Sequence, residues 1–327
     1  MHYIMTNPSK ETCQHGQTIG WGRDRQGNAR RRCKLCGKVL SIVAPRPLGR
    51  MRISLENATL ILSLLTEGSS IRSAERISGV HRDTICKLLR LAGEKCEAHL
   101  SRLVREVPVS DVQADEIWSF VGMKEKTKKR KEITAPELGD AYTFVAMERT
   151  SKVVLAWHLG RRTSEDTNVF MAKLASVARP AEGAERFQLS TDGFQPYPAA
   201  VEAHLGGRVD YAQLVKTYSN ETVDSERRYS PARIISAEKV AVQGTPAEER
   251  ICTSHVERQN LHMRMQLRRF TRLTNAFSRS RENLRAALAV HFAAFNLCWM
   301  HRTIRCTPAM AAGLVRKPWT VRELLTA

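Results

Sequence analysis

The sequence has 327 residues, enough for about two domains with a sizeable core. It holds 52 Lys and Arg against 33 Asp and Glu, and the formal net charge of +19 favours a polyanionic partner, nucleic acid before an anionic membrane. The most apolar stretch, residues 286–300, contains His291 and Asn296 and falls short of the roughly 18 residues of a membrane span, so no membrane segment is predicted.

The cysteine content indicates the compartment. The first residues lack a continuous apolar core, so no secretory signal is predicted. Eight cysteines in a chain without such a signal indicate a reducing environment, where thiols bind metal or pack in a core. We therefore predict a cytoplasmic, nucleoid-associated protein.

Residues 1–43 are strongly basic and carry a cysteine pattern. Cys33 and Cys36, followed by a glycine, form a C-x-x-C-G knuckle, a tight turn that directs two thiolates at one point. Cys13 and His15 supply an upstream pair and complete a Cys3His set for tetrahedral zinc. The segment between the pairs is too polar to form a core, so a structural zinc would hold it together. We predict a zinc-ribbon-like module over residues 1–43.

The first half of this zinc site is weaker than the second. Cys13 and His15 are separated by one residue, which is tighter than the usual two-residue gap and makes His15 the least secure ligand. The alternative is a redox dithiol, or cysteines without any ligand.

Residues 44–50 contain two prolines and predict a linker, and helical periodicity follows over residues 51–105. Gly68 ends a first helix, Ser70 can cap a second, and Gly79 permits a tight turn before a third. This arrangement is typical of a helix-turn-helix, whose last helix enters the major groove. The side chains predicted to face DNA from the third helix are Arg82, Thr84 and Lys87. The alternative is three packed helices with no role in DNA binding.

From residue 111 the pattern changes to short β-rich runs. The first run alternates, with Asp115 on one face and Glu116 on the other. Two hairpin runs, a helix and a fourth strand ending at Asp192 follow; the runs and the helix cover residues 142–148, 153–159 and 164–178. Three β-runs, a helix and another strand fit a ribonuclease-H-like layer, which would bring Asp115 beside Asp192. An aspartate among β-rich residues is costly to bury unless it is paired or bound to a cation.

A third carboxylate comes from a helix predicted over residues 253–273. Glu257 lies beside the apolar stripe of this helix and can close a third corner of a metal site. Arg264 and Arg268 follow it by seven and eleven residues, near the same side of the helix, and are predicted to face phosphates.

A run of positive charge over residues 123–134 follows the first strand directly. It has two interpretations, a solvated hairpin loop or a guide for DNA phosphates. In the second interpretation the contacting residues are Lys128, Lys129 and Arg130.

Three carboxylates suit two Mg²⁺ ions, with Mn²⁺ as a substitute. They neutralise the metals without removing their Lewis acidity, which an in-line displacement at phosphorus requires. Each acid alone has a structural alternative: a turn for Asp192, an ion pair for Glu257, a strand-edge acid for Asp115. Their joint placement after a DNA-binding module favours the metal site.

On these residues the chain resembles the DDE transposases of bacterial insertion sequences, in particular the IS1-like group. The motifs that carry the resemblance are "DEIWSFVG" from Asp115, "STDGFQPY" from Ser190 and "SHVERQN" from Ser254. The resemblance spans nearly the whole chain and implies that Asp115, Asp192 and Glu257 form the catalytic, metal-binding triad, with Arg264 as the basic residue one helical repeat after the glutamate.

The resemblance implies an α/β protein with a ribonuclease-H-like core, a mixed five-stranded sheet flanked by helices. The core, residues 106–285, would follow the zinc ribbon and an all-α helix-turn-helix, and a helical cover over residues 286–327 would complete the chain. It also implies water attack at the ends of the element, then attack of the freed 3′-hydroxyl on target DNA. The implied partners are double-stranded DNA, both terminal repeats and target, and a second copy of the chain in at least a dimer.

Two other functions stay open at this point. One is a non-catalytic regulator, in which the N-terminal segments bind DNA and the rest only dimerises; it predicts no cleavage that depends on divalent metal. The other is a ribonuclease-H-like nuclease or junction resolvase with a different DNA substrate.

Overall fold

The computed structural model describes residues 10–25, 27–42, 46–218 and 234–327. The chain divides into two compact units, Met1–Arg52 and Ile53–Ala327. Each unit is described by itself. Among the described residues, no helix has the length and apolar character needed to cross a bilayer.

The first unit is built on a three-stranded antiparallel sheet in the order β1-β2-β3. The strands are β1 (Thr18–Arg23), β2 (Ala29–Cys33) and β3 (Val39–Ile42). Nearly all of their side chains are exposed, whereas Cys13 and Cys33 are buried. Gly37 takes a left-handed φ of 73° and donates its N–H to the carbonyl of Cys33, which closes the knuckle turn. The small sheet thus has almost no apolar core of its own.

The second unit begins with three helices, as predicted from the capping residues. They are α1 (Leu55–Thr66), α2 (Ile71–Ser78) and α3 (Arg82–Leu103). The Ser70 hydroxyl accepts the N–H of Ser73 at the start of α2, and Gly79 ends α2 with a φ of 68°. On the third helix the apolar residues Ile85, Leu88 and Leu89 are buried.

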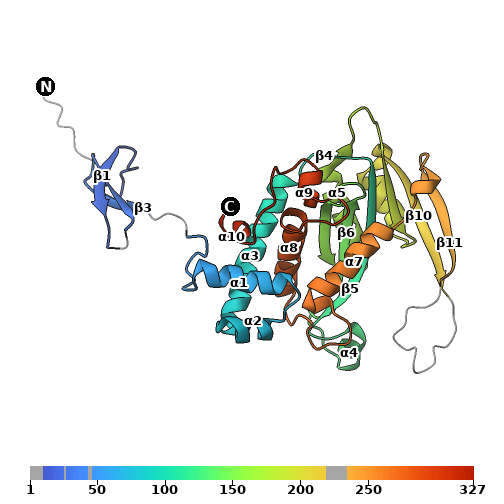
Figure 1. Cartoon of the computed structure of the whole chain (residues 1–327), viewed down its shortest axis with the longest axis horizontal. Helices are drawn as coiled ribbons and strands as arrows, with labels where there is room; N and C mark the ends of the chain where they lie inside the picture. The colour runs from blue at the N-terminus through green and yellow to red at the C-terminus, as the bar shows by residue number, and fades with distance from the viewer. Residues whose placement is uncertain (1–9, 26, 43–45, 219–233) are drawn as a thin grey trace. The chain divides into compact units, whose positions relative to one another are not determined.

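The C-terminal helices are α8 (Arg281–Leu297), α9 (Pro308–Ala311) and α10 (Glu323–Thr326). Of these, α8 and α10 pack on α3 and α9 packs on α8. Figure 1 shows α3 and α8 side by side. Gly93 of α3 permits this approach, since a Cβ there would lie 2.6 Å from the Cα of Ala286. The predicted boundaries at residues 105 and 285 fall inside one compact unit and stay predictions.

The central sheet of the second unit is mixed and has six strands in the order β11-β10-β9-β5-β6-β7. The strands are β5 (Asp111–Val121), β6 (Gly139–Glu148), β7 (Val154–Gly160), β9 (Phe187–Asp192), β10 (Val209–Tyr218) and β11 (Ile234–Gln243). Strands β5, β6 and β7 are antiparallel neighbours, β9 is parallel to β5, and β10 is parallel to β9.

The prediction of five strands was wrong by one. The additional strand, β11, pairs antiparallel with β10 at the sheet edge. Its side chains are almost all exposed, so its pairing depends on backbone hydrogen bonds and leaves no apolar alternation in the sequence.

Helices cover both faces of the sheet. The helices are α5 (Ser164–Val177), α6 (Tyr197–His204) and α7 (Ser254–Gln266). Gln113 of β5 accepts the backbone N–H of His255 in α7, whereas Tyr197 of α6 donates to Glu116 of β5. Residues 113 and 116 point to opposite faces of a strand, so α6 and α7 lie on opposite sides of β5.

Short elements complete the unit. They are β4 (Val107–Val109) paired with β8 (Ala178–Pro180), α4 (Glu125–Arg130), and the 3-10 helices η1 (Gly206–Arg208), η3 (Glu248–Arg250) and η4 (Arg268–Phe270). Residues 123–134 lie in the connection between the antiparallel neighbours β5 and β6, as the hairpin interpretation expects, and α4 forms within this connection. Lys128 on α4 is buried, and its Nζ donates to the carbonyl of Leu138 at 3.2 Å.

Candidate functional site

Three carboxylates meet on two neighbouring parallel strands, in the middle of β5 and at the end of β9. Asp115 and Glu116 lie on β5 and Asp192 ends β9, and one oxygen of each lies within 4.8 Å of the others. The register pairs Gln113 with Ser190 in parallel strands, so two residues further along Asp115 stands beside Asp192. The sequence-based expectation that these two aspartates converge is met by the structure.

Asp192 combines a turn with the site. Its Oδ1 accepts the backbone N–H of Phe194 at 3.1 Å, the short-range turn that an aspartate before glycine predicts. Its Oδ2 lies 3.5 Å from Nη2 of Arg162, and the Arg162 guanidinium stacks 4.2 Å above the Phe194 ring. The Asp192 side chain therefore both stabilises the turn and belongs to the carboxylate cluster.

Glu116 was missed as a member of this cluster. Its side chain is only 3% exposed and is held by Nε of Arg162 at 2.5 Å and by the Tyr197 hydroxyl at 2.9 Å. The alternation of β5 correctly placed it on the face opposite Asp115. Consecutive residues of a strand point to opposite faces, so the sequence carries no signal that Glu116 joins Asp115 and Asp192.

Burial and mutual repulsion raise the pKa values of the cluster. Burial, and then the negative charges of Glu116 and Asp192, raise the pKa of Asp115 to about 7. Burial likewise raises the pKa of Asp192, and it raises the pKa of Glu116 together with the charge of Asp192. Carboxylates that repel one another in a partly buried site are stabilised by a cation, and their hard oxygen donors fit Mg²⁺ or Mn²⁺.

Glu257 lies near the cluster but is not part of the group of three. It occupies the first turn of α7, where it accepts the Thr253 hydroxyl at 2.7 Å and forms an ion pair with Lys216 of β10. Its negative charge contributes to the raised pKa values of both Asp115 and Asp192, so it lies within electrostatic range of them. The structure therefore brings Asp115 and Asp192 together, whereas the third predicted triad residue, Glu257, lies near them in an ion pair with Lys216.

The arginines predicted behind Glu257 separate in the structure. Arg264 is on α7 and half-buried, and burial lowers its pKa while the charge of Asp115 raises it. Arg268 is exposed, but α7 ends at Gln266 and Arg268 lies in η4. The expectation that Arg268 lies on the same helix as Glu257, near the same side, was wrong, because α7 ends two residues before Arg268.

The other predicted DNA contacts divide by exposure. Arg82 and Lys87 are exposed on α3 and Thr84 is half-buried. Lys129 and Arg130 are exposed on α4, whereas the buried Lys128 is not available to a phosphate. The DNA contacts of the exposed residues stay predictions.

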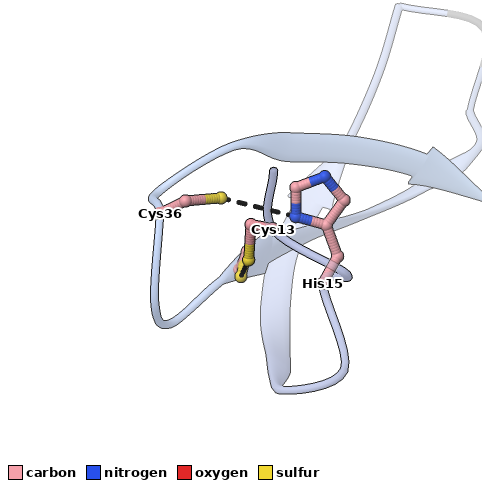
Figure 2. Close-up of side chains that lie close together, drawn as sticks. Cys13, His15 and Cys36 are labelled. Atoms are coloured by element: carbon pink, nitrogen blue, oxygen red, sulfur yellow. Dashed lines mark hydrogen bonds between the residues drawn. The ribbon is translucent and has the colours of Figure 1, made fainter. Parts of the chain in front are cut away.

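The first unit contains a second candidate metal centre. One ligand atom each from Cys13, His15, Cys33 and Cys36 lies within 4.8 Å of the others. Figure 2 shows the imidazole of His15 directed toward the thiol of Cys36, with Nδ1 and Sγ 3.4 Å apart. The sulfurs of Cys13 and Cys33 are 3.7 Å apart. Three sulfurs and one imidazole nitrogen are a typical structural zinc set, and His15, the least secure ligand by spacing, lies in place.

Thiolate formation is favoured at Cys33, whereas burial and hydrogen bonds with Cys33 and Cys36 raise the pKa of Cys13. The backbone N–H of Cys36 and a hydrogen bond from His15 lower the pKa of Cys33 to about 6. A thiolate is the form of cysteine that binds metal. The four side chains therefore fit a zinc ion in geometry and donor type, with Cys33 the most readily ionised ligand.

Comparison with known proteins adds little. No family model matches the chain, and no curated protein matches it significantly. Among solved structures, the piggyBac transposase synaptic complex with hairpin DNA is similar at 10% identity over 87% of this chain and 72% of that one, with a TM-score of 0.39. The Mos1 strand transfer complex is similar at 12% identity over 79% and 80%, with a TM-score of 0.21. Both scores are low, and neither likeness establishes an activity for this chain.

Proposed function

We propose that this chain is a DNA transposase of the DDE type, built on a ribonuclease-H-like core. The observation that carries the proposal is the register of β5 and β9, which sets Asp115 of β5 beside Asp192 at the end of β9, with the pKa of both raised. The order of three antiparallel strands, a helix and a further parallel strand supports the core that the sequence predicts. The net charge of +19 supports a DNA substrate.

The carboxylates of this chain would hold two divalent ions. Asp115 and Asp192 offer oxygens to a shared ion, and Glu257 completes the set when its carboxylate leaves Lys216. When bound, Mg²⁺ would activate the attacking oxygen and stabilise the leaving one. The role of the protein side chains is to fix the two ions and the phosphate in line.

Arg162 and Glu116 have a different role in this proposal. Arg162 neutralises Asp192 and Glu116 before any cation arrives, and Glu116 with Tyr197 keeps its guanidinium at the site. The buried Glu116 is therefore a positioning residue, and Glu257 is the third metal-binding carboxylate.

The reaction that we infer has two steps. Water attacks the phosphodiester at the end of the element and releases a 3′-hydroxyl, which then attacks a phosphodiester of the target DNA. Each step exchanges one P–O bond for another, so no oxidant or covalent protein intermediate is required. The zinc-ribbon-like unit and the helix-turn-helix segment would bind the terminal repeats, and two ends would be joined by at least a dimer.

A cleavage assay with matched variants tests the proposal. The duplex is the DNA that flanks the protein's own gene, incubated with and without Mg²⁺, and the cut positions are mapped. We expect cuts at defined end positions only with metal, and Asp192→Asn should abolish cutting while duplex binding persists. Cutting of branched DNA without preference for the ends would favour a resolvase, and binding without any metal-dependent cut would favour a regulator.

A further inference from the structure

A cavity of about 890 Å³ lies between the helix-turn-helix segment and the chain that follows α7. We name it the arginine cavity after the side chains that line it, Arg72, Arg82, Arg268, Arg269 and Arg279. No aspartate or glutamate is among its lining residues. Its floor is apolar and includes Leu89, Phe277 and Val290. A space with cationic walls, an apolar floor and no acid suits an anion that carries a less polar part.

Three of these arginines have no carboxylate partner. Arg72 is paired with Glu75 at 3.0 Å, and Arg82 lies 3.6 Å from Asp83. Within the described parts of the chain, Arg268, Arg269 and Arg279 make no ion pair with an acid. Their positive charge is left for a ligand to neutralise.

Arg269 is the most constrained of the three. Its Nη1 donates to the Ser278 hydroxyl at 2.9 Å, and burial lowers its pKa. A guanidinium stays charged in proteins, so a half-buried one without an acid is costly until an anion binds. Guanidinium groups also match the geometry of phosphate oxygens.

The walls of the cavity are preformed. Gly68, in the α1–α2 turn, has a φ of 83°, and a Cβ there would lie 2.9 Å from the carbonyl oxygen of Met265. The turn therefore packs directly on the last residues of α7. On the other side, Arg90 of α3 donates to Asn283 of α8 at 3.1 Å. The cavity thus joins the segment predicted to bind DNA to the helix that carries Glu257.

We propose that the arginine cavity binds a nucleotide unit of a DNA strand, with its phosphate on Arg268 and Arg269 and its sugar over the apolar floor. The inference rests on the proposed function. Arg82 both lines the cavity and begins α3, so a duplex contacting the exposed start of α3 would pass its backbone across the cavity mouth. The contact would fix the strand between its binding helix and the acidic cluster.

The salt dependence of duplex binding tests the contact. The plot of log affinity against log salt loses about 0.9 of slope for each phosphate contact removed. We expect this loss for Arg268→Gln, whose side chain is exposed, and wild-type slope for Arg102→Gln, an exposed arginine of α3 outside the cavity. Arg269→Lys keeps the positive charge but loses the paired N–H donors of the guanidinium. The melting temperature of this variant reports whether it folds. Unchanged slope in Arg268→Gln would overturn the inference.

Alkylation of Cys86 separates DNA from a free ligand. Cys86 is half-buried and lines the cavity, so an occupant should slow its reaction with iodoacetamide, measured by peptide mass spectrometry. We expect protection by the duplex and none by the same concentration of dAMP or inorganic phosphate. Protection by dAMP alone would make this a free-nucleotide site, and equal alkylation in every arm would leave the cavity without a ligand; either result contradicts the proposal.

Failure of this inference differs from failure of the proposed function. A wild-type protein that binds the duplex and protects Cys86 but never cuts DNA would end the transposase assignment and leave the cavity contact standing. Suppose instead that the protein cuts DNA, but the duplex does not protect Cys86 from alkylation and Arg268→Gln leaves the salt dependence of binding unchanged. That result would end the cavity proposal and leave the transposase assignment standing.

Discussion

Asp115 and Asp192 stand side by side because β5 and β9 run parallel in a register that pairs Gln113 with Ser190. This places two carboxylates that are 77 residues apart in sequence next to each other, in the middle of β5 and at the end of β9, and Glu116 joins them from the opposite face. The cluster is costly to the apoprotein and valuable to a metal-dependent reaction. Stability and catalysis should therefore respond in opposite directions when it is changed.

Asp115→Asn should stabilise the apoprotein above neutral pH. The pKa of Asp115 is about 7 in the folded chain against 3.8 for an ordinary aspartate, so the folded state keeps a proton that the unfolded state releases between these values. Stability therefore falls as pH rises through that window, by an amount on the order of 4 kcal/mol at most. Asp115→Asn has no carboxyl group to ionise at this position, so the variant does not lose this stability as pH rises.

Thermal melts of wild type and Asp115→Asn from pH 4 to 8 check the sign. The gap between the two melting temperatures should widen toward pH 8, in favour of the variant. A difference in melting temperature that narrows as pH rises would show that ionising Asp115 does not destabilise the folded state. The variant should also lose metal-dependent cleavage.

Mg²⁺ or Mn²⁺ should raise the melting temperature of the wild-type protein. A ligand that binds only the folded state adds RT ln(1 + [L]/Kd), about 2.7 kcal/mol at one hundred times Kd. The increase should vanish in Asp192→Asn, because a carboxylate that contacts the ion is gone. An equal increase in both proteins would place the cation elsewhere.

Glu116→Gln and Glu257→Gln should differ in kind. Glu257→Gln should reduce cleavage by about a thousandfold or more, the usual scale for a group that stabilises charge in the transition state. Glu116→Gln weakens the contacts that hold Arg162 and Tyr197, so a loss of roughly tenfold is expected. Single-turnover cleavage at saturating Mg²⁺ measures both, and the reverse order of losses would make Glu116 the third metal ligand.

Cys33→Ser should release zinc and unfold only the first unit. Nearly all of its strand side chains are exposed, so without the metal it has little else to hold it. We expect about one zinc per wild-type chain by elemental analysis and none in the variant. The main melting transition should remain, because residues 53–327 form a separate compact unit. Equal zinc in both proteins would reject the site.

Gly93→Val should destabilise the second unit strongly. A Cβ at Gly93 would sit 2.6 Å from the Cα of Ala286, so α3 and α8 must move apart, at a cost of about 3 kcal/mol or more. Gly207→Val is a control, since a Cβ there meets no atom within 4 Å. Urea unfolding measures both, and equal midpoints would show that the helices do not meet as described.

The sequence predicted much of this architecture because each part has a local signal. Ser70 and Gly79 marked the ends of α2, and the hydrophobic lead-in to Asp192 marked β9. Features that depend on tertiary packing were missed. Strand β11 pairs through its backbone, α7 stops at Gln266 before Arg268, and Lys128 folds under Leu138.

The acidic site shows the same division. Asp115 and Asp192 follow from strand order, which a pattern of short β-runs can indicate. The approach of Glu116 to the two aspartates and the pairing of Glu257 with Lys216 depend on side-chain geometry that no spacing encodes. Asp115, Asp192 and Glu257 as one metal-binding set therefore remain a proposal.

A crystal structure of the protein with Mn²⁺, with anomalous data collected at the manganese edge, tests the central claim most directly. We predict an anomalous peak bonded to carboxylate oxygens of both Asp115 and Asp192, with Glu257 turned from Lys216 toward the metal. A fully occupied Mn²⁺ site elsewhere, with Asp192 still on Arg162, would contradict it.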